Sequence, residues 1–123
     1  MAEEMTLTSS NIRYLLAIKS LETDGRGVRC VDIARSLELS RPSVHNMTDT
    51  LVEMGLVERN KSSAAKLTEL GENIAERYGR YYNSVSRLLS ENFPDMDNIR
   101  TAVCFLLSEV PEGNLKAFSK GIN

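Results

Sequence analysis

The sequence contains a single histidine and two cysteines in 123 residues, which limits the chemistry that it can support. Cys30 and Cys104 stand far apart, with no CxxC spacing and no neighbouring histidine, so neither a disulfide framework nor a structural zinc site is expected. One histidine and the lack of a glycine-rich loop leave no Ser/His/Asp set, nucleotide loop or paired-carboxylate constellation. We therefore expect a protein that is not an enzyme.

Long apolar runs and a strong excess of one charge are also missing. No run approaches the roughly 18 apolar residues of a membrane helix, and the start MAEEMTLTSS lacks a signal peptide's basic and apolar parts, so a cytoplasmic protein is expected. The net charge of −2 argues against binding polyanions by bulk charge, although a local basic face is compatible with it. The length fits one domain, with an oligomer interface a reasonable expectation for so small a core.

What the sequence does contain is helical periodicity, interrupted once by a short β-rich stretch. Capping residues, breaking residues and apolar spacing predict helices over about 9–23, 30–37, 40–54, 68–89, 95–108 and 112–120. Ser9 or Ser10 is expected to cap the first of them and Ser40 the third. Residues 56–60 and 65–67 predict a two-stranded hairpin with an exposed tip. This order of elements indicates a mainly α fold, a winged helix-turn-helix with a two-stranded β wing followed by a helical region.

The third predicted helix sorts into two faces. The stripe expected to lie inside holds Val44, Met47, Leu51 and Gly55. The opposite stripe, expected at the surface, holds Pro42, His45, Asn46 and Asp49. A helix capped by a serine, with an outward polar stripe and a wing behind it, is typical of the recognition helix that enters the DNA major groove.

The residues of this predicted DNA surface each suit a particular contact. Asn46 suits an adenine edge, His45 a base edge and Pro42 a thymine methyl group. Ser40, Ser43 and the amide groups of residues 41–43 suit a phosphate, with charge added by Arg41. The wing contributes further positive charge near the duplex backbone from Arg59, Lys61 and Lys66.

An alternative reading starts from the acidic residues of the same helix. Asp49 and Glu53 place negative charge on its outward face, where DNA phosphates would lie. This favours a winged-helix protein-interaction module that does not bind DNA. A salt titration separates the two readings, because true DNA binding weakens steeply as salt rises.

A set of residues in the first part of the chain resembles the diphtheria toxin repressor and manganese transport regulator family. It comprises Tyr14-Leu15-x-Ala17-Ile18, Asp32-Ile33-Ala34-x-x-Leu37, Ser40-x-Pro42-Ser43-Val44, Met47, Leu51, Gly55-Leu56-Val57 and Leu67-Thr68-Glu69-x-Gly71. The resemblance implies a metal-dependent transcriptional repressor, with residues 1–75 as the DNA-binding domain and 76–123 as a helical dimerisation region. It also implies a homodimer on a palindromic operator, with Ser40, Pro42, Ser43 and Asn46 at the DNA surface. The last motif is shared with multiple-antibiotic-resistance regulators, so a regulator of that type, responding to a small ligand, is a further alternative.

The resemblance further implies a site for a divalent transition metal, manganese or iron, built from carboxylate and histidine ligands. The corresponding positions of this sequence are occupied by Arg13, Leu16, Tyr82, Cys104, Leu107 and Ser108. Cys104 is the one candidate ligand among them, and Glu109, a weaker candidate, lies one residue past the expected place. We expect the metal switch to be absent or heavily rebuilt, with no cofactor assigned. Cys104, inside the apolar run 103–107, is expected to be a small buried hydrophobe.

Overall fold

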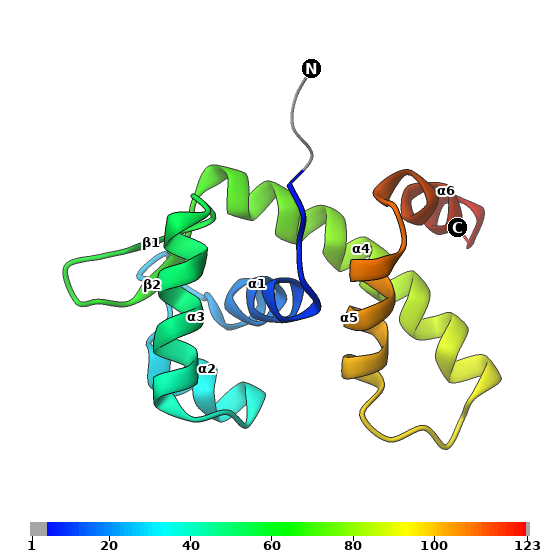
Figure 1. Ribbon diagram of the computed structural model, residues 1–123, viewed down its shortest axis with the longest axis horizontal. Coiled ribbons are helices and arrows are strands. Elements are labelled where there is room, and N and C mark those ends of the chain that lie inside the picture. Colours follow the sequence, from blue (N-terminus) through cyan, green and yellow to red (C-terminus); the bar gives the residue numbers. More distant parts are fainter. Residues whose placement is uncertain (1–4, 123) are drawn as a thin grey trace. The chain divides into compact units, whose positions relative to one another are not determined.

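The computed structural model describes residues 5–122, and it confirms the mainly α winged helix-turn-helix (Figure 1). The elements are α1 Ser9–Leu21, α2 Cys30–Leu37, α3 Arg41–Glu53, β1 Val57–Arg59, β2 Ala65–Leu67, α4 Glu69–Asn92, α5 Ile99–Glu109 and α6 Glu112–Ile122. They form two compact units, one of residues 14–76 and one of residues 5–13 together with residues 77–122. Within residues 5–122, no helix combines the length and the apolar character needed to span a membrane.

The turn between α2 and α3 is fixed by local backbone chemistry. Glu38 adopts a left-handed conformation (φ 57°) that ends α2, and its N–H donates to the Ala34 carbonyl oxygen. Ser40 then caps α3 as predicted, because its Oγ accepts a hydrogen bond of 3.2 Å from the Ser43 N–H. Gly55 follows the helix with φ 78°, a conformation that costs glycine little.

The inner face of α3 packs against α2 and β1. Val44 and Leu51 are fully buried, as expected, but the third fully buried side chain is Thr48 and not Met47, which is half-buried. A threonine is tolerated there because its hydroxyl donates to the Val44 carbonyl oxygen at 2.7 Å, which leaves no unpaired polar group in the core. The predicted inward stripe is therefore confirmed at Val44 and Leu51 and wrong at Gly55, which is exposed, while Met47 is only half-buried.

The wing is an antiparallel hairpin in which Val57 pairs with Leu67, Glu58 with Lys66 and Arg59 with Ala65. Val28 adds a bridge on the other side of β2, exchanging hydrogen bonds of 2.7 and 2.8 Å with Ala65. This bridge could not be predicted, because a single paired residue leaves no periodic pattern in the sequence. It fixes the wing to the loop before α2.

Two helix starts show how side chains close the free amides of the first turn. α1 is capped by Thr8, and not by Ser9 or Ser10, because Thr8 and Asn11 exchange two hydrogen bonds of 3.0 Å between side chain and backbone. Before α4, the Thr68 hydroxyl accepts from the Gly71 N–H at 3.1 Å and donates to the Gly55 carbonyl oxygen at 2.7 Å. Thr68 thereby ties the end of α3 to the start of α4.

The second unit combines residues 5–13 with the distal part of α4, α5 and α6. Its buried side chains include Tyr78, Tyr81, Val85, Val103, Leu107 and Leu115. Leu88, on α4 beside the buried Leu89, is 39% exposed. α5 begins at Ile99 and not at residue 95, because Asn98 adopts a left-handed conformation (φ 53°) just before it. α4 and α6 are joined through Glu112, which accepts hydrogen bonds from Arg77 at 2.7 Å and from the Tyr81 hydroxyl at 2.8 Å.

Candidate nucleic-acid interface

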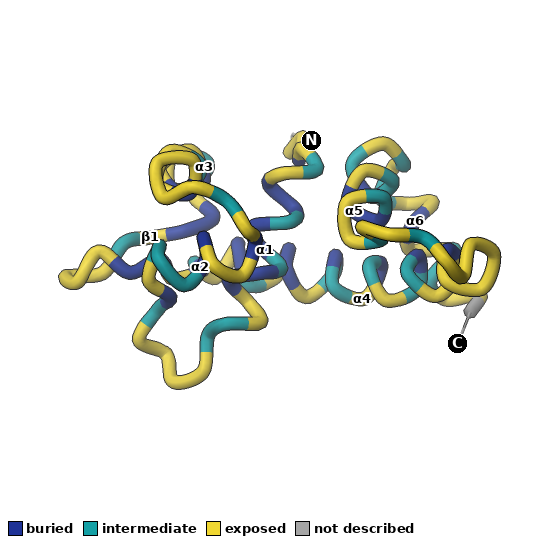
Figure 2. Tube along the Cα trace, turned by 90° about the horizontal axis from the view of Figure 1, so that it is seen from below, coloured by how far each residue is buried: buried dark blue, intermediate teal, exposed yellow. Residues whose placement is uncertain are grey.

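The predicted outward stripe of α3 lies at the surface. Pro42, His45, Asn46 and Asp49 are all exposed, as the helical spacing predicts, and the His45 side chain is 63% exposed. Figure 2 shows exposed positions over the start of α3 and over the tip of the wing. The unit of residues 14–76 therefore presents a polar helix edge and a hairpin tip to solvent. On the opposite side of α3, Val44, Thr48 and Leu51 are buried in the core.

The first turn of α3 keeps donors available for an anion. The Ser40 hydroxyl donates to Ser43 Oγ at 2.9 Å while its oxygen caps the helix. The Ser43 hydroxyl proton is thus left to face solvent, beside the exposed Arg41 side chain. Because helix N-termini carry partial positive charge and free amides, this turn suits a phosphate oxygen.

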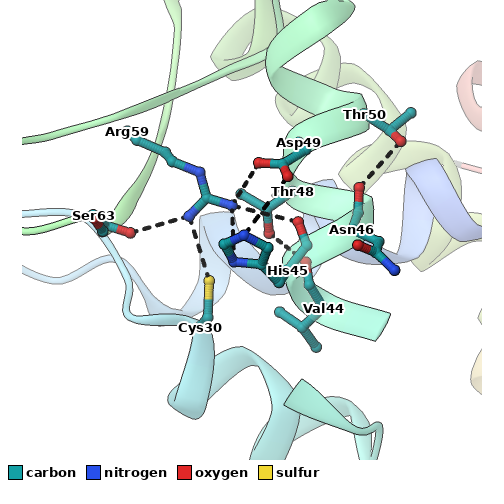
Figure 3. A network of polar contacts seen from close by, with 9 residues as sticks. All are labelled: Cys30, Val44, His45, Asn46, Thr48, Asp49, Thr50, Arg59 and Ser63. Carbon is teal, nitrogen blue, oxygen red and sulfur yellow. Dashed lines mark hydrogen bonds and ion pairs between the residues drawn. The ribbon is translucent and has the colours of Figure 1, made fainter. Parts of the chain in front are cut away.

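Asn46 occupies the centre of the exposed stripe. Its backbone carbonyl accepts a hydrogen bond of 3.2 Å from the Thr50 hydroxyl, and its side chain extends away from the contacts of Arg59 (Figure 3). An exposed side-chain amide offers one acceptor and two donors, the combination that matches an adenine edge. The structure places Asn46 where the sequence predicted it, and its contact with DNA stays a prediction.

Arg59 does not extend from the wing into solvent but turns back onto α3. Its Nη2 lies 2.9 Å from Asp49 Oδ1 and 3.4 Å from the His45 carbonyl oxygen. Its Nη1 donates to the Ser63 carbonyl oxygen at 3.3 Å and lies 3.8 Å from Cys30 Sγ (Figure 3). Only 21% of the Arg59 side chain is exposed. One guanidinium therefore joins α3, the wing and the start of α2.

The ion pair between Arg59 and Asp49 changes the charge that α3 presents to solvent. Although burial lowers the pKa of Arg59, its hydrogen bonds with Asp49 and Cys30 outweigh burial and raise the pKa above its ordinary value. The guanidinium is thus permanently charged, and it neutralises the Asp49 carboxylate, which His45 Nε2 also approaches at 3.7 Å. Asp49 is a paired group and not a free negative charge facing the solvent.

A signal for the inward orientation of Arg59 was present in the sequence. Alternate residues of a strand point to opposite faces, so Arg59 shares a face with the buried Val57. Glu58, the residue between Val57 and Arg59, points to the other face. It is exposed and pairs across the hairpin with the exposed Lys66. Lys66 thus lies on the opposite face of the hairpin from Arg59, next to a carboxylate.

The wing tip is shaped by a residue that sequence reasoning passed over. Asn60 Oδ1 accepts from the Ser62 and Ala64 N–H groups at 2.9 and 3.0 Å, and its Nδ2 donates to the Arg26 carbonyl oxygen at 2.6 Å. These bonds close the turn that carries the exposed Lys61. An Asn at the start of a polar turn was the available signal, since its side chain can bond backbone amides two residues on.

The positions assigned to a metal by resemblance do not offer a suitable donor set. Among residues 5–122, no three His, Cys, Asp or Glu side chains gather as ligands of one ion. Leu107 is buried, the Ser108 hydroxyl donates to its own helix at the Phe105 carbonyl (2.7 Å), and Glu109 is exposed. Manganese and iron(II) prefer several carboxylate and imidazole ligands, which Arg13, Leu16 and Tyr82 do not supply.

Cys104 is buried on α5, as expected for a small apolar residue. Burial raises the pKa of its thiol, although Arg13 and Arg100 partly offset this. Because a metal binds the thiolate, a raised pKa disfavours Cys104 as a ligand. The residues at these positions therefore do not fit the metal site of the family that they resemble.

Comparison with known proteins supports the fold. Residues 10–61 match the family described as the IclR helix-turn-helix domain. No curated protein matches the chain. Among solved structures, the chain is similar to IdeR of T. acidophilum, with a TM-score of 0.69 and 19% identity over 99% of this chain and 55% of that one. A hypothetical protein from Sulfolobus solfataricus has a TM-score of 0.63 and 22% identity, over 95% of this chain and 90% of that one.

A further similar structure is that of ScaR with bound Zn²⁺, with a TM-score of 0.65 and 18% identity over 90% of this chain and 52% of that one. ScaR is described as a manganese-activated repressor. The chain spans about half the length of IdeR and ScaR. The matched domain differs in family from the one that the sequence motifs resemble, so the assignment to the diphtheria toxin repressor family stays a prediction. What these likenesses show is a helix-turn-helix domain within a winged-helix fold.

Proposed function

We propose that the protein is a sequence-specific, double-stranded-DNA-binding transcription regulator, which represses by occupying a promoter. The observation that carries this proposal is the exposed polar stripe of a capped α3, whose acidic member, Asp49, is neutralised by Arg59 at 2.9 Å. With that charge paired, the face presents Ser43, His45 and Asn46 to a groove, while Glu53, exposed one turn beyond Asp49, keeps a negative charge near the end of the helix. The match of residues 10–61 to a helix-turn-helix domain supports the same role.

The roles of the individual residues follow from their positions. Asn46 and His45 would meet base edges, with Pro42 against a thymine methyl group. Ser40, Arg41 and Ser43 would hold a phosphate at the start of α3. Lys61 at the wing tip would contact the flanking backbone, and Lys66 would add less because Glu58 faces it. Arg59 would position α3 against the wing and not touch DNA directly.

The helical region from residue 76 onward is proposed to pair two copies of the chain. It exposes large apolar side chains at Leu88, Phe93 and Phe105, which are 39%, 55% and 59% exposed. Burying such groups against a second copy would remove apolar surface from water. A two-fold homodimer places two α3 helices on a palindromic operator, with half-sites about one helical turn or a multiple of it apart.

The regulator is proposed to act in the cytoplasm without a metal corepressor. IdeR and ScaR have the same fold, and ScaR is described as manganese-activated. In this chain the positions implied for the metal carry Arg13, Leu16 and Leu107, whose side chains do not suit such an ion. The control of DNA binding is therefore assigned to another signal.

The deciding experiment is selection of duplexes bound by the full chain from a random pool, with and without added Mn(II). We expect enrichment of one palindromic sequence in both arms. Affinity for the enriched duplex should fall steeply with salt, with a logarithmic slope of about −0.9 for each phosphate contacted. A chain that enriches nothing and shows no affinity for any duplex at low salt would instead be a protein-interaction module.

A further inference from the structure

A cavity of about 390 Å³ lies in the unit that begins at Arg77, between α4 and α6. Its walls carry four basic side chains, Arg80 and Arg87 from α4 and Lys116 and Lys120 from α6. Hydroxyl groups are offered to the lining by Tyr81, Ser84 and Ser119. For a chain of net charge −2, this is a strong local concentration of positive charge.

Acidic groups of the chain balance these four charges only in part, since Glu112, outside the lining, attracts Lys116. Within residues 5–122, no Asp or Glu lines the cavity, and none of the four cations forms an ion pair. Like charges held in one concave site repel one another, and the site gains when an anion enters. All four residues are exposed, so solvent and salt screen part of this repulsion, and a bound anion would relieve the rest.

The Glu112 carboxylate, which meets the cavity residue Tyr81, is bonded to two residues of α4. It forms an ion pair with Arg77 at 2.7 Å and accepts from the Tyr81 hydroxyl at 2.8 Å. Although burial by itself raises the pKa of Glu112, these hydrogen bonds outweigh it and keep the pKa below its ordinary value. Its charge therefore mainly joins α4 to α6, and it attracts Lys116 without forming an ion pair with that residue.

A second, independent observation points to a ligand. The Ser119 hydroxyl oxygen is buried and has no hydrogen-bond partner among the described residues, although Ser119 lines the cavity. Buried hydroxyl groups without a partner are rare in folded proteins. Because the Ser119 oxygen is covered, its side chain would have to turn toward the cavity before it donates to a bound oxyanion.

We propose that this cavity binds a small polyvalent anion bearing phosphate or carboxylate groups, and that the anion acts as the effector of the regulator. Arg80 and Arg87 offer planar forks to its oxygens, Lys116 and Lys120 add point charges, and Ser119 donates a hydrogen bond. The ligand bridges α4 and α6 and thereby stabilises the helical unit. The regulatory part of this proposal rests on the proposed function, whereas the binding itself does not.

The dimensions of the site favour a metabolite over a duplex. A volume of about 390 Å³ lies in the range of ligand pockets, which begins at about 300 Å³. Duplex phosphates are contacted by extended basic surfaces that follow the backbone, and this chain lacks an overall basic charge. The experiment must therefore distinguish binding of a small anion at this cavity from binding of the DNA backbone there.

The test is calorimetric titration of the full chain, without DNA, with inorganic pyrophosphate in one arm and citrate in the other. Ionic strength is matched with sodium chloride, because salt screens charges of this kind. We expect saturable binding in at least one arm, and the better arm identifies phosphate or carboxylate chemistry. Arg80→Gln and Lys116→Gln should each weaken binding about tenfold, which corresponds to about 1.4 kcal/mol. The matched control is Arg100→Gln, an exposed charge on α5 outside the cavity, which should leave binding unchanged.

Three results would overturn the proposal. One is the absence of saturable binding in both arms, and another is equal weakening in Arg80→Gln and Arg100→Gln, which would indicate unspecific screening. The third is competition in which any random duplex displaces pyrophosphate from the wild-type chain, because it would assign the cavity to DNA backbone. A chain that binds pyrophosphate but no duplex would leave the site standing and remove only the proposed function.

Discussion

Asp49 of α3 and Arg59 of β1 lie 2.9 Å apart and join the exposed helix to the wing. The arginine is the less exposed partner, with 21% of its side chain exposed against 54% for the aspartate. Because the same guanidinium also donates to backbone carbonyls of His45 and Ser63, its position is fixed by several contacts. This pair turns a charge that opposes DNA binding into one that orients the helix.

We predict that Arg59→Met weakens operator binding without changing the number of phosphates contacted. A partly exposed ion pair contributes up to about 1 kcal/mol to stability, so the fold should survive. A double-mutant cycle with Asp49→Asn, followed by denaturant unfolding, measures the coupling between the two residues. The salt slope of DNA binding is the decisive reading: it should stay unchanged in Arg59→Met and become shallower by about 0.9 in Lys61→Gln. A shallower slope in Arg59→Met would mean that the arginine contacts a phosphate.

Asn46→Ala is expected to lower affinity for the selected operator by about 1–3 kcal/mol, while affinity for random DNA changes little. The physical reason is that an amide reading a base edge contributes only on the correct sequence. Alanine favours helix more than asparagine does, so loss of structure is not expected. Thr50→Ala on the same helix is the control, because its hydroxyl bonds the Asn46 carbonyl within the helix. Equal losses on both kinds of DNA would show that Asn46 meets only the backbone.

Added Mn(II) or Fe(II) should not alter operator affinity at micromolar concentration. The residues at the positions implied for the metal offer hydrocarbon, guanidinium and a buried thiol whose pKa is raised by burial. Fluorescence anisotropy with a labelled operator, with and without metal, measures the effect. A tenfold tightening would contradict this reading of the site, and Cys104→Ser would then show whether the thiol takes part.

Regular periodicity made α3 predictable. The spacing of its apolar residues located the exposed stripe correctly, including His45 and Asn46, and Ser40 and Gly55 fixed both ends. Thr48 was missed in the core because a hydroxyl bonded to its own helix behaves as an apolar group, which the residue type alone does not reveal.

Features that depend on packing between residues far apart in the chain could not be predicted from the sequence. Val28 meets Ala65 across 37 positions through a single bridge, which leaves no pattern. The same holds for the cavity, since Arg80 and Lys116 look like ordinary solvated charges until α4 and α6 bring them together. Arg59 lies between these cases: strand alternation indicated its inward face, but its partners depended on how the wing packs on α3.

The stability of the helical unit should depend on pH through Glu112. The pKa of Glu112 is held below its ordinary value of 4.5 in the folded chain, so its ionised form stabilises the fold. That contribution is complete above about pH 4.5 and is lost as the pH falls through the lower, folded-state pKa. Tyr81 remains a donor throughout, because burial and the Glu112 carboxylate raise its pKa to about 12. Unfolding free energies from pH 7 to 3 should therefore converge for wild type and Glu112→Gln, while the exposed Glu109→Gln should run parallel to wild type.

Gly71 is predicted to be a position where even a methyl group is not accommodated. A Cβ there would clash with the Leu56 carbonyl oxygen, lie 3.0 Å from its carbon and press on Leu67 at 3.3 Å. Because the obstacle is backbone at the base of the wing, relief requires α4 to shift, and overpacking of this kind costs about 1–3 kcal/mol. Gly71→Ala should lower the unfolding free energy by that amount, measured in urea.

Gly113→Ala provides the matched control for Gly71. It also lies within a helix, but nothing stands within 4 Å of an added Cβ, so alanine should be neutral or stabilise by up to about 1 kcal/mol through helix propensity. The two substitutions make the same chemical change, and their opposite effects would isolate the close approach of α4 to Leu56. If Gly71→Ala proved as stable as Gly113→Ala, the start of α4 would be free to move away from the wing. The Thr68 bonds to Gly55 and Gly71 would then not hold α3, the wing and α4 in one arrangement.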